Sequence, residues 1–241
     1  MNIKHIGLTI RDKDTNHISK EKYLSAKREG FLGWEERHYI AQVPKASLNY
    51  DLNMRYFASL DKEEFEKYLS NFCKKNHFEE CFDLTMLDGV QGLYIMVLGE
   101  YKQIYIGKAN DIKKRIQSHW NKKKSLERLI FGDVCSSRLS IDSFGSLDTT
   151  NVYFYKTTCP EKAEARIVNV ADKKYLLNRT AGGIGYADTL TDSETLAKMA
   201  VVAGRKPRNF TSFTNLEELK SVLTKEDVRY LVHRYPELLQ K

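Results

Sequence analysis

Apolar and polar positions alternate most clearly in the middle of the chain. Two short apolar runs, at 93–98 and 103–106, are separated by a polar, glycine-containing stretch, which is typical of a β-hairpin. Beyond them, the spacing of apolar residues predicts helices over 111–120, from 125 into 131 and over 160–177, with a strand at 152–155 before the last helix. This order of elements predicts an α/β (α+β) unit, in which a small antiparallel sheet is flanked by helices.

The flanking segments have weaker patterns. Loosely alternating apolar residues between 3 and 10 predict one edge strand, and helical spacing predicts helices over 20–28 and 61–74. Ser59 or Asp61 would serve as the N-cap of the second of these helices. A charged linker at 204–208 precedes two short helices that would pack as a hairpin. We therefore expect three parts: an N-terminal domain or extension at 1–89, the α/β domain at 90–190, and a linker with a helical hairpin at 191–241.

The composition is that of an ordinary globular protein. Of the 241 residues, 41% are hydrophobic and 29% are charged, so the chain should fold around a core of its own. The four cysteines form no CxxC pair and match no metal-ligand spacing, which favours a reduced protein. No signal peptide and no run of about 18 apolar residues is visible, so we expect a cytoplasmic protein that is not bound to a membrane.

Positive charge is concentrated in the middle of the chain. The formal charge of +7 divides into −1 for residues 1–89, +6 for 90–190 and +2 for 191–241. The middle part includes the basic groups 113–115 and 122–124. A charge run is often only a solvated face, but binding to phosphates needs positive charge gathered at one place. The distribution therefore favours a polyanionic partner over a neutral one.

Two glycine–tyrosine tripeptides mark the predicted hairpin. Gly92-Leu93-Tyr94 is followed, after ten residues, by Tyr105-Ile106-Gly107, and the next helix carries Arg115 and His119 four residues apart. That spacing places both side chains on one helix face, so both can point into one cleft, while Ile112, Ile116 and Trp120 lie on another face, which is expected to pack on the core. The pattern resembles the GIY-YIG nuclease family, in which the two tripeptides lie on adjacent strands; Leu93 replaces the commonest middle residue.

The resemblance extends to the last predicted helix and covers about residues 90–185. It implies a metal-binding glutamate, for which Glu164 fits better than Glu161. Ala163, Ile167, Val170 and Ala171 are expected to form the buried stripe of this helix, which leaves Glu164 beside the stripe at the edge of the cleft. Further along, Asn178 and the pair Gly182-Gly183 also match the family pattern.

The resemblance implies a metal-dependent endodeoxyribonuclease that hydrolyses phosphodiester bonds in double-stranded DNA. Glu164 would hold Mg²⁺ or Mn²⁺, and Arg115 would give the scissile phosphate two hydrogen bonds. Tyr94 would act as general base. Its pKa, ordinarily about 10, would have to be lowered by Lys108, Arg115 and the metal, or its proton relayed through His119 or Tyr105. Which of these three side chains is the base stays open at this point.

Other residues of the pattern have supporting roles. Lys108, Lys114 and Asn178 are candidate substrate-binding residues, although Asn178 fits better as a residue that orients the end of the last helix. Gly92 and Gly107 are expected to be structural, because glycine allows a close approach of neighbouring backbone on the sheet.

The biological type of nuclease is less constrained. A restriction-type enzyme that cuts a defined site comes first, because the catalytic module is small and about 140 residues lie outside it. The alternatives are a repair or mobile-element nuclease, a non-cutting DNA-binding module on the same fold, and a subunit that docks to a partner through residues 191–241. No known base-reading motif occurs in either flank. Cutting both strands of a symmetric site would call for a homodimer.

Overall fold

The computed structural model describes residues 1–13, 16–25, 43, 46–47, 49–51, 53–122 and 139–178. It divides into two compact units, of which the first contains Met1–Ser19, Phe57–Lys124 and Ser140–Thr189. In the second unit, helix α1 (Lys20–Leu24) accounts for the start of the helix predicted at 20–28. The predicted helix at 125–131, the glycine pair at 182–183 and the C-terminal helical hairpin lie outside the described residues.

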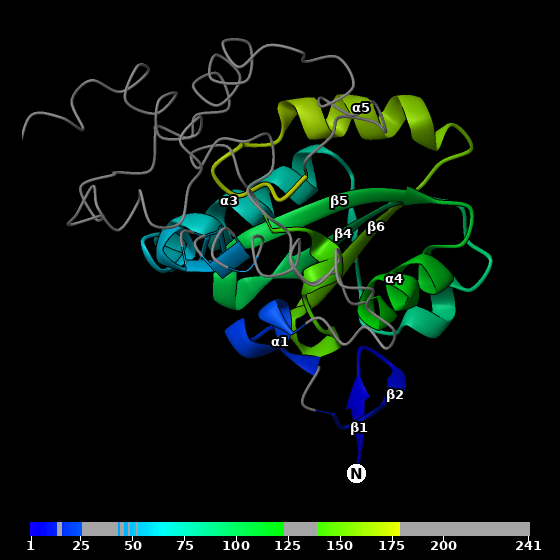
Figure 1. Ribbon diagram of the computed structural model, residues 1–241. Coiled ribbons are helices and arrows are strands. Elements are labelled where there is room, and N and C mark those ends of the chain that lie inside the picture. Colours follow the sequence, from blue (N-terminus) through cyan, green and yellow to red (C-terminus); the bar gives the residue numbers. More distant parts are fainter. Residues whose placement is uncertain are drawn as a thin grey trace, which may run out of the picture. The chain divides into compact units, whose positions relative to one another are not determined.

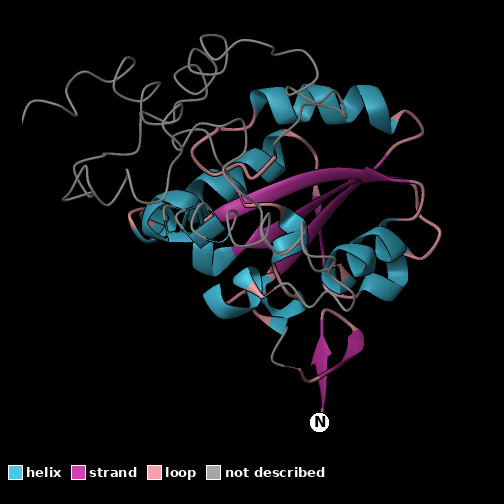
Figure 2. Ribbon diagram, in the orientation of Figure 1, coloured by secondary structure: helices cyan, strands magenta, loops and turns pink. Residues whose placement is uncertain are grey.

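A four-stranded antiparallel sheet forms the centre of the first unit (Figure 2). In spatial order its strands are β3 (Glu79–Cys81), β6 (Asn151–Lys156), β4 (Gly92–Leu98) and β5 (Gln103–Ala109). The central strand β4 is buried along its whole length, since it lies between β6 and β5. Strands β4 and β5 form the predicted hairpin, joined by the short 3-10 turn η3 (Gly99–Tyr101) and by Lys102 in the left-handed region. The predicted hairpin is therefore confirmed.

Three helices flank this sheet: α3 (Lys62–Lys75), α4 (Ile112–Asn121) and α5 (Pro160–Val170). Figure 1 shows α4 and α5 on opposite sides of the sheet. Asp61 caps α3 by accepting a hydrogen bond from the backbone of Glu64, and Asp111 caps α4 in the same way through Lys114. The predicted fold class, an antiparallel sheet flanked by helices, is confirmed. Among the described helices, none is both long enough and apolar enough to cross a membrane.

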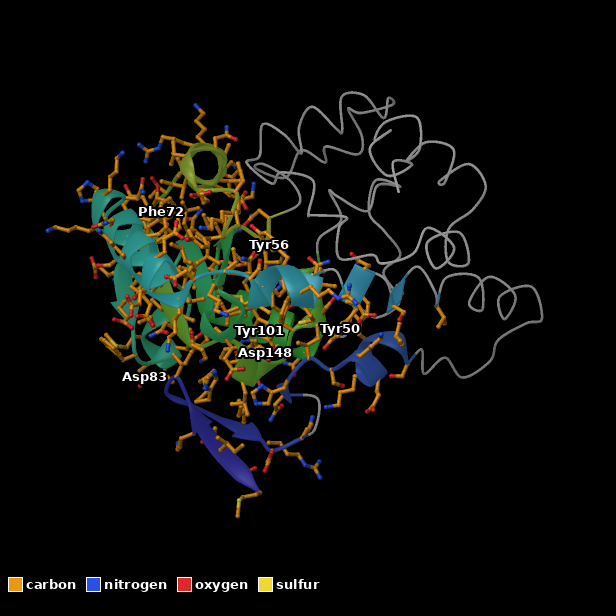
Figure 3. All side chains as sticks on the ribbon, turned by 90° about the vertical axis from the view of Figure 1, so that its left-hand side faces the viewer. Tyr50, Tyr56, Phe72, Asp83, Tyr101 and Asp148 are labelled. Atoms are coloured by element: carbon orange, nitrogen blue, oxygen red, sulfur yellow. The ribbon has the colours of Figure 1, made fainter. Side chains whose placement is uncertain are left out.

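The prediction of a single edge strand between residues 3 and 10 is wrong. This segment is a two-stranded hairpin of β1 (Asn2–His5) and β2 (Leu8–Arg11). Both residues of its two-residue turn, Ile6 and Gly7, have positive φ angles of 43° and 76°, the geometry that reverses a chain most tightly. The turn is attached to the rest of the unit, because the backbone N–H of Leu84 donates to Ile6. The neighbouring Asp83, labelled in Figure 3, lies so close that a Cβ on Gly7 would overlap it.

The sheet also includes strand β3, which precedes the predicted α/β domain in the sequence. Strand β3 pairs with β6 in the register Glu79↔Phe154 to Cys81↔Val152. Helix α3, which leads into β3, lies in the same unit. Residues before position 90 therefore supply one edge of the sheet that the sequence analysis assigned to 90–190 alone.

The last predicted helix is shorter than expected. It ends at Val170 instead of 177, and the chain then turns back along the outer edge of β5. There the backbone of Ile104 donates to Tyr175 at 2.7 Å and accepts from Leu177 at 2.9 Å. Residues 175–177 are fully buried in this position. Continuing the helix would have left the outer edge of β5 without these backbone partners, which is why the strand-like course prevails.

Candidate active site

The two signature tyrosines lie side by side on one face of the sheet. Tyr94 on β4 pairs across with Gly107 on β5, and Met96, two residues further along, pairs with Tyr105. Their ring centroids are 6.3 Å apart. Residues two apart on a strand share a face, so Tyr94 and Tyr105 point to the same side. The hairpin thus brings both tyrosines into one cluster.

The two signature glycines make room for different neighbours. A Cβ on Gly92 would lie 2.2 Å from the backbone oxygen of Tyr155 on β6, the close backbone approach expected from the sequence. A Cβ on Gly107 would instead lie 2.3 Å from the hydroxyl oxygen of Tyr94. The neighbour of Gly107 is therefore a side chain: the glycine leaves the space that the Tyr94 phenol occupies.

Tyr94 begins a chain of three hydrogen-bonded side chains. Its hydroxyl lies 2.8 Å from Nε2 of His119 on α4, and Nδ1 of His119 lies 2.5 Å from Oδ1 of Asp142 in the 3-10 turn η5 (Ile141–Ser143). Tyr94 and His119 are almost completely buried, whereas the Asp142 side chain is 20% exposed. The ring of Tyr105 packs edge-on against His119 at 5.3 Å. Asp142 is not predictable from the sequence, because it lies in an irregular segment that belongs to no motif.

Burial governs the protonation of both tyrosines. It raises the pKa of Tyr94 well above its ordinary value, and the nearby Tyr105 and Glu164 act in the same direction against the opposing charge of Arg115. Burial likewise raises the pKa of Tyr105. In the protein without metal, desolvation outweighs the charge of Arg115, so the pKa of Tyr94 is raised. This direction favours proton relay over a lowered pKa of Tyr94.

The pKa of Asp142 is shifted in the opposite direction, below its ordinary value. Burial works against its charged form, but the hydrogen bond with His119 and the nearby charges of Lys122 and Arg115 together lower its pKa. The Lys122 Nζ lies 3.9 Å from Oδ2 of Asp142. Asp142 is therefore ionised at neutral pH.

Helix α4 contributes a second group to Tyr94. Arg115, one turn before His119, interacts electrostatically with Tyr94, while its side chain stays largely open to solvent. The four-residue spacing thus brings Arg115 and His119 toward the same tyrosine, in agreement with the prediction that both point into one cleft. The expected core face was partly wrong, since His119 is more deeply buried than Trp120. The Trp120 indole instead donates to Thr149 at 3.0 Å.

Glu164 lies on the buried face of α5. Only 7% of it is exposed, and its Oε2 lies 3.3 Å from Nζ of Lys108 on β5. The predicted buried stripe is correct at Ile167 and Ala171 but wrong at Val170, which is 62% exposed, and Glu164 and Val168 are buried with the stripe instead of lying beside it. Burial raises the pKa of Glu164 despite the opposing charge of Lys108. Glu164 interacts electrostatically with Arg115 and with both signature tyrosines, so it belongs to the same cluster.

A divalent cation fits Glu164 as a single protein ligand. Within the described part of the chain, no three His, Cys, Asp or Glu side chains are grouped so as to hold a metal. The Oε2 of Glu164 is buried and has no hydrogen-bond partner besides the Lys108 ion pair. A hard cation such as Mg²⁺ accepts one carboxylate and completes its shell with water and phosphate oxygens. The donor set is thus compatible with Mg²⁺ or Mn²⁺ bound together with substrate.

Two of the predicted substrate-binding residues have other contacts. The Nζ of Lys114 pairs with Asp111 at 2.9 Å on the exposed side of α4. The amide of Asn178 is buried, where it accepts a hydrogen bond from the backbone N–H of Ile106 at 2.9 Å and donates to the backbone oxygen of Ile106 at 2.6 Å. Asn178 therefore has a structural contact, but the contact is with strand β5 and not at the end of α5, where the sequence placed it.

Comparison with known protein families agrees with the site. Residues 90–173 match the family model described as the GIY-YIG catalytic domain, which confirms the resemblance seen in the sequence. The match spans well under half of the chain, and it includes all the side chains of the cluster described above. Neither the curated proteins nor the solved structures gave a match. Residues 90–173 are therefore similar to the catalytic domain of GIY-YIG nucleases in sequence pattern and in the side chains of the cluster.

Proposed function

We propose that the protein is a metal-dependent endonuclease that hydrolyses phosphodiester bonds in double-stranded DNA. The observation that carries this proposal is the hydrogen-bonded pair of Tyr94 and His119, surrounded by Arg115, Lys108 and Glu164. Hydrolysis of a phosphodiester needs a base for the attacking water, positive charge for the transition state and stabilisation of the leaving oxygen. The cluster contains side chains suited to each of these tasks.

Tyr94 and His119 supply the base. The Tyr94 oxygen takes a proton from the attacking water as its own proton moves to Nε2 of His119, 2.8 Å away. Because the phenolate never has to form in a buried site, the raised pKa of Tyr94 is no obstacle to this transfer. Tyr105 packs against the imidazole and closes the site beside it.

Arg115 and Lys108 supply positive charge. The guanidinium of Arg115 is largely exposed, so it can give a phosphate two parallel hydrogen bonds. A divalent ion held by Glu164, when bound, would stabilise charge on the phosphate and on the leaving oxygen. Lys108, which pairs with Glu164 in the protein alone, would contact the same phosphate in the complex.

A restriction-type enzyme is the first candidate within this class. The matched domain is small, and residues 1–89 and 191–241 leave room for elements that read sequence. Most of the net positive charge lies in residues 90–190, as expected for a segment that contacts the DNA backbone. Cleavage of both strands at a symmetric site would require two copies of the chain.

The first test is incubation of the purified chain with supercoiled plasmid, in Mg²⁺, in Mn²⁺ and in EDTA. Glu164→Gln should abolish cleavage, and Arg115→Lys should reduce it about 100-fold or more, because a lysine cannot form the two-pronged contact. Glu161→Gln is the matched control: it removes an exposed carboxylate one turn earlier on α5 and should leave cleavage unchanged.

The products decide between the types of nuclease. Discrete fragments that disappear with EDTA would support a restriction-type enzyme, whereas nicked circles alone would support a repair or mobile-element nuclease. Absence of cleavage by the wild type, together with salt-sensitive binding to the plasmid, would overturn the proposal in favour of a non-cutting or partner-dependent module.

A further inference from the structure

We infer that Asp142 is a positioning residue of the relay: it fixes the tautomer and orientation of His119 so that Nε2 can accept the proton of Tyr94. The inference rests on the proposed function and adds a residue to it. Its basis is the geometry of three side chains from three elements, β4, α4 and η5, joined through the two nitrogens of one imidazole.

The contact with Asp142 determines which nitrogen of His119 carries the proton. An ionised carboxylate only accepts hydrogen bonds, so the 2.5 Å contact between Oδ1 of Asp142 and Nδ1 requires the proton to be on Nδ1. In the neutral imidazole, Nε2 then has a free lone pair, and the Tyr94 hydroxyl must be the donor in the 2.8 Å bond. Asp142 thereby sets the direction of transfer from Tyr94 to His119.

Removal of the Asp142 carboxylate would change the tautomer of His119. With no acceptor at Nδ1, the neutral imidazole can carry its proton on Nε2 instead. Nε2 would then donate to the Tyr94 oxygen and could not accept from it, so the relay would stop at Tyr94. In serine-protease triads, the loss of the corresponding aspartate lowers turnover by about 10⁴-fold for this reason.

Each proton that moves in the proposed hydrolysis has a donor and an acceptor. The water oxygen forms a bond to phosphorus and its proton passes to the Tyr94 oxygen, while the Tyr94 proton passes to Nε2 of His119. The bond between phosphorus and the leaving oxygen breaks with its electron pair on that oxygen, which takes a proton from solvent. His119, now an imidazolium beside ionised Asp142, later returns its proton to solvent. No oxidant or other reactant is needed.

The charges around the imidazole fit this assignment. Asp142 is the carboxylate in contact with His119, and it offsets the positive charge that His119 acquires during transfer. Lys122 and Arg115 face Asp142 and keep it ionised. The backbone holds the carboxylate in place, because the N–H of Asp142 donates to the Ser140 hydroxyl at 3.2 Å.

The test measures the tautomer directly by ¹⁵N NMR of histidine-labelled full-length protein. The His119 signals are assigned with His119→Gln. In the wild type we expect His119 to be protonated at Nδ1, with an unprotonated Nε2. In Asp142→Asn the amide can donate to Nδ1, and we expect the proton to move to Nε2. Plasmid cleavage should then fall by about 100-fold or more in kcat, with KM unchanged.

Asp88→Asn is the matched control. It makes the same chemical change at a carboxylate that pairs with Lys113 on the same helix at 2.8 Å, outside the relay. Both the tautomer of His119 and the cleavage rate should stay as in the wild type.

Two results would overturn the inference: a wild-type His119 protonated at Nε2, or an Asp142→Asn variant whose kcat stays within about threefold of the wild type. If Asp142→Asn fails to fold, the wild-type tautomer alone decides. If the wild type cuts no DNA, the proposed nuclease function fails, whereas the tautomer still shows whether Asp142 sets the protonation of His119.

Discussion

Tyr94 and Glu164 are ionisable side chains that the fold keeps away from water. Burial raises the pKa of each, so the ionised form of each is less favourable in the folded protein than in the unfolded chain. For Tyr94 this has no consequence for stability at neutral pH, because phenols stay protonated there. For Glu164 the raised pKa does affect stability, because the pKa of an ordinary glutamate lies well below 7 and its side chain is already ionised at neutral pH.

The sign of the effect at Glu164 follows from the direction of its shift. Because its pKa in the folded protein lies above that in the unfolded chain, Glu164 favours folding at low pH, and this contribution is lost as pH rises through the folded-state pKa. A glutamine cannot ionise. We therefore expect Glu164→Gln to be more stable than the wild type at pH 7 without divalent ions, with a smaller difference at about pH 4.

Urea unfolding at a series of pH values measures this difference. Glu161→Gln controls for the loss of one negative charge from α5 at an exposed position. If Glu164→Gln gains no stability relative to the wild type between about pH 4 and pH 7, the burial of Glu164 has no energetic consequence. Loss of activity with a gain in stability would mark Glu164 as a side chain kept for function.

At the scale of elements, the sequence predicted what depends on local spacing. Helices α3 and α4 and strand β4 appear within one residue of their predicted bounds, and β5 extends three residues further than predicted, because apolar periodicity and capping residues are local signals. The predicted helix at 160–177 stopped early, because residues 175–178 gain backbone partners on β5 that are about 70 positions away in the chain. Hydrogen bonds between residues so far apart in the chain cannot be predicted from the local spacing of apolar residues.

The site follows the same division. Tyr94, Tyr105, Arg115, His119 and Glu164 were found from the sequence, because they lie on regular elements at spacings typical of one family. Asp142 was not found, since an isolated aspartate in an irregular segment is ordinarily a turn residue. Only the fold brings it within hydrogen-bonding distance of His119. The degree of burial of Glu164 was likewise decided by packing against the sheet.

Asn178 helps to attach the segment after α5 to the sheet, together with the backbone bonds of Ile104 to Tyr175 and Leu177. Asn178→Ala would leave the buried N–H and C=O of Ile106 without their partners, at a cost of about 1–3 kcal/mol for each group. We expect the free energy of unfolding to fall by about 3 kcal/mol, as measured by urea denaturation. The control is Asn151→Ala, which removes only an exposed hydrogen bond to Glu80 and should cost less than about 0.5 kcal/mol. Equal losses in the two variants would contradict this role of Asn178.

At the scale of the whole unit, one buried carboxylate joins segments far apart in the chain. Asp148, in the 3-10 turn η6 (Ser146–Asp148), accepts hydrogen bonds from the backbone of Ile18 at 2.8 Å and from the Tyr101 hydroxyl at 3.0 Å. It also accepts from the backbone of Gly145 at 2.7 Å and lies 3.1 Å from Nδ1 of His17. Figure 3 labels Asp148 and Tyr101 side by side. Asp148 thus holds the N-terminal segment against the loop that carries Asp142.

Replacing Asp148 by asparagine should therefore weaken both ends of this connection. One oxygen becomes an NH₂ group, which can only donate and so faces N–H and O–H donors that lose their acceptor. We expect a loss of about 3 kcal/mol in unfolding free energy and faster hydrogen exchange at the Ile18 amide. Asp172→Asn is the control, because Asp172 bonds only an exposed local N–H through its side chain. Unchanged exchange at Ile18 in Asp148→Asn would mean that the N-terminal segment is held by its other contacts, such as the bond between Leu84 and Ile6.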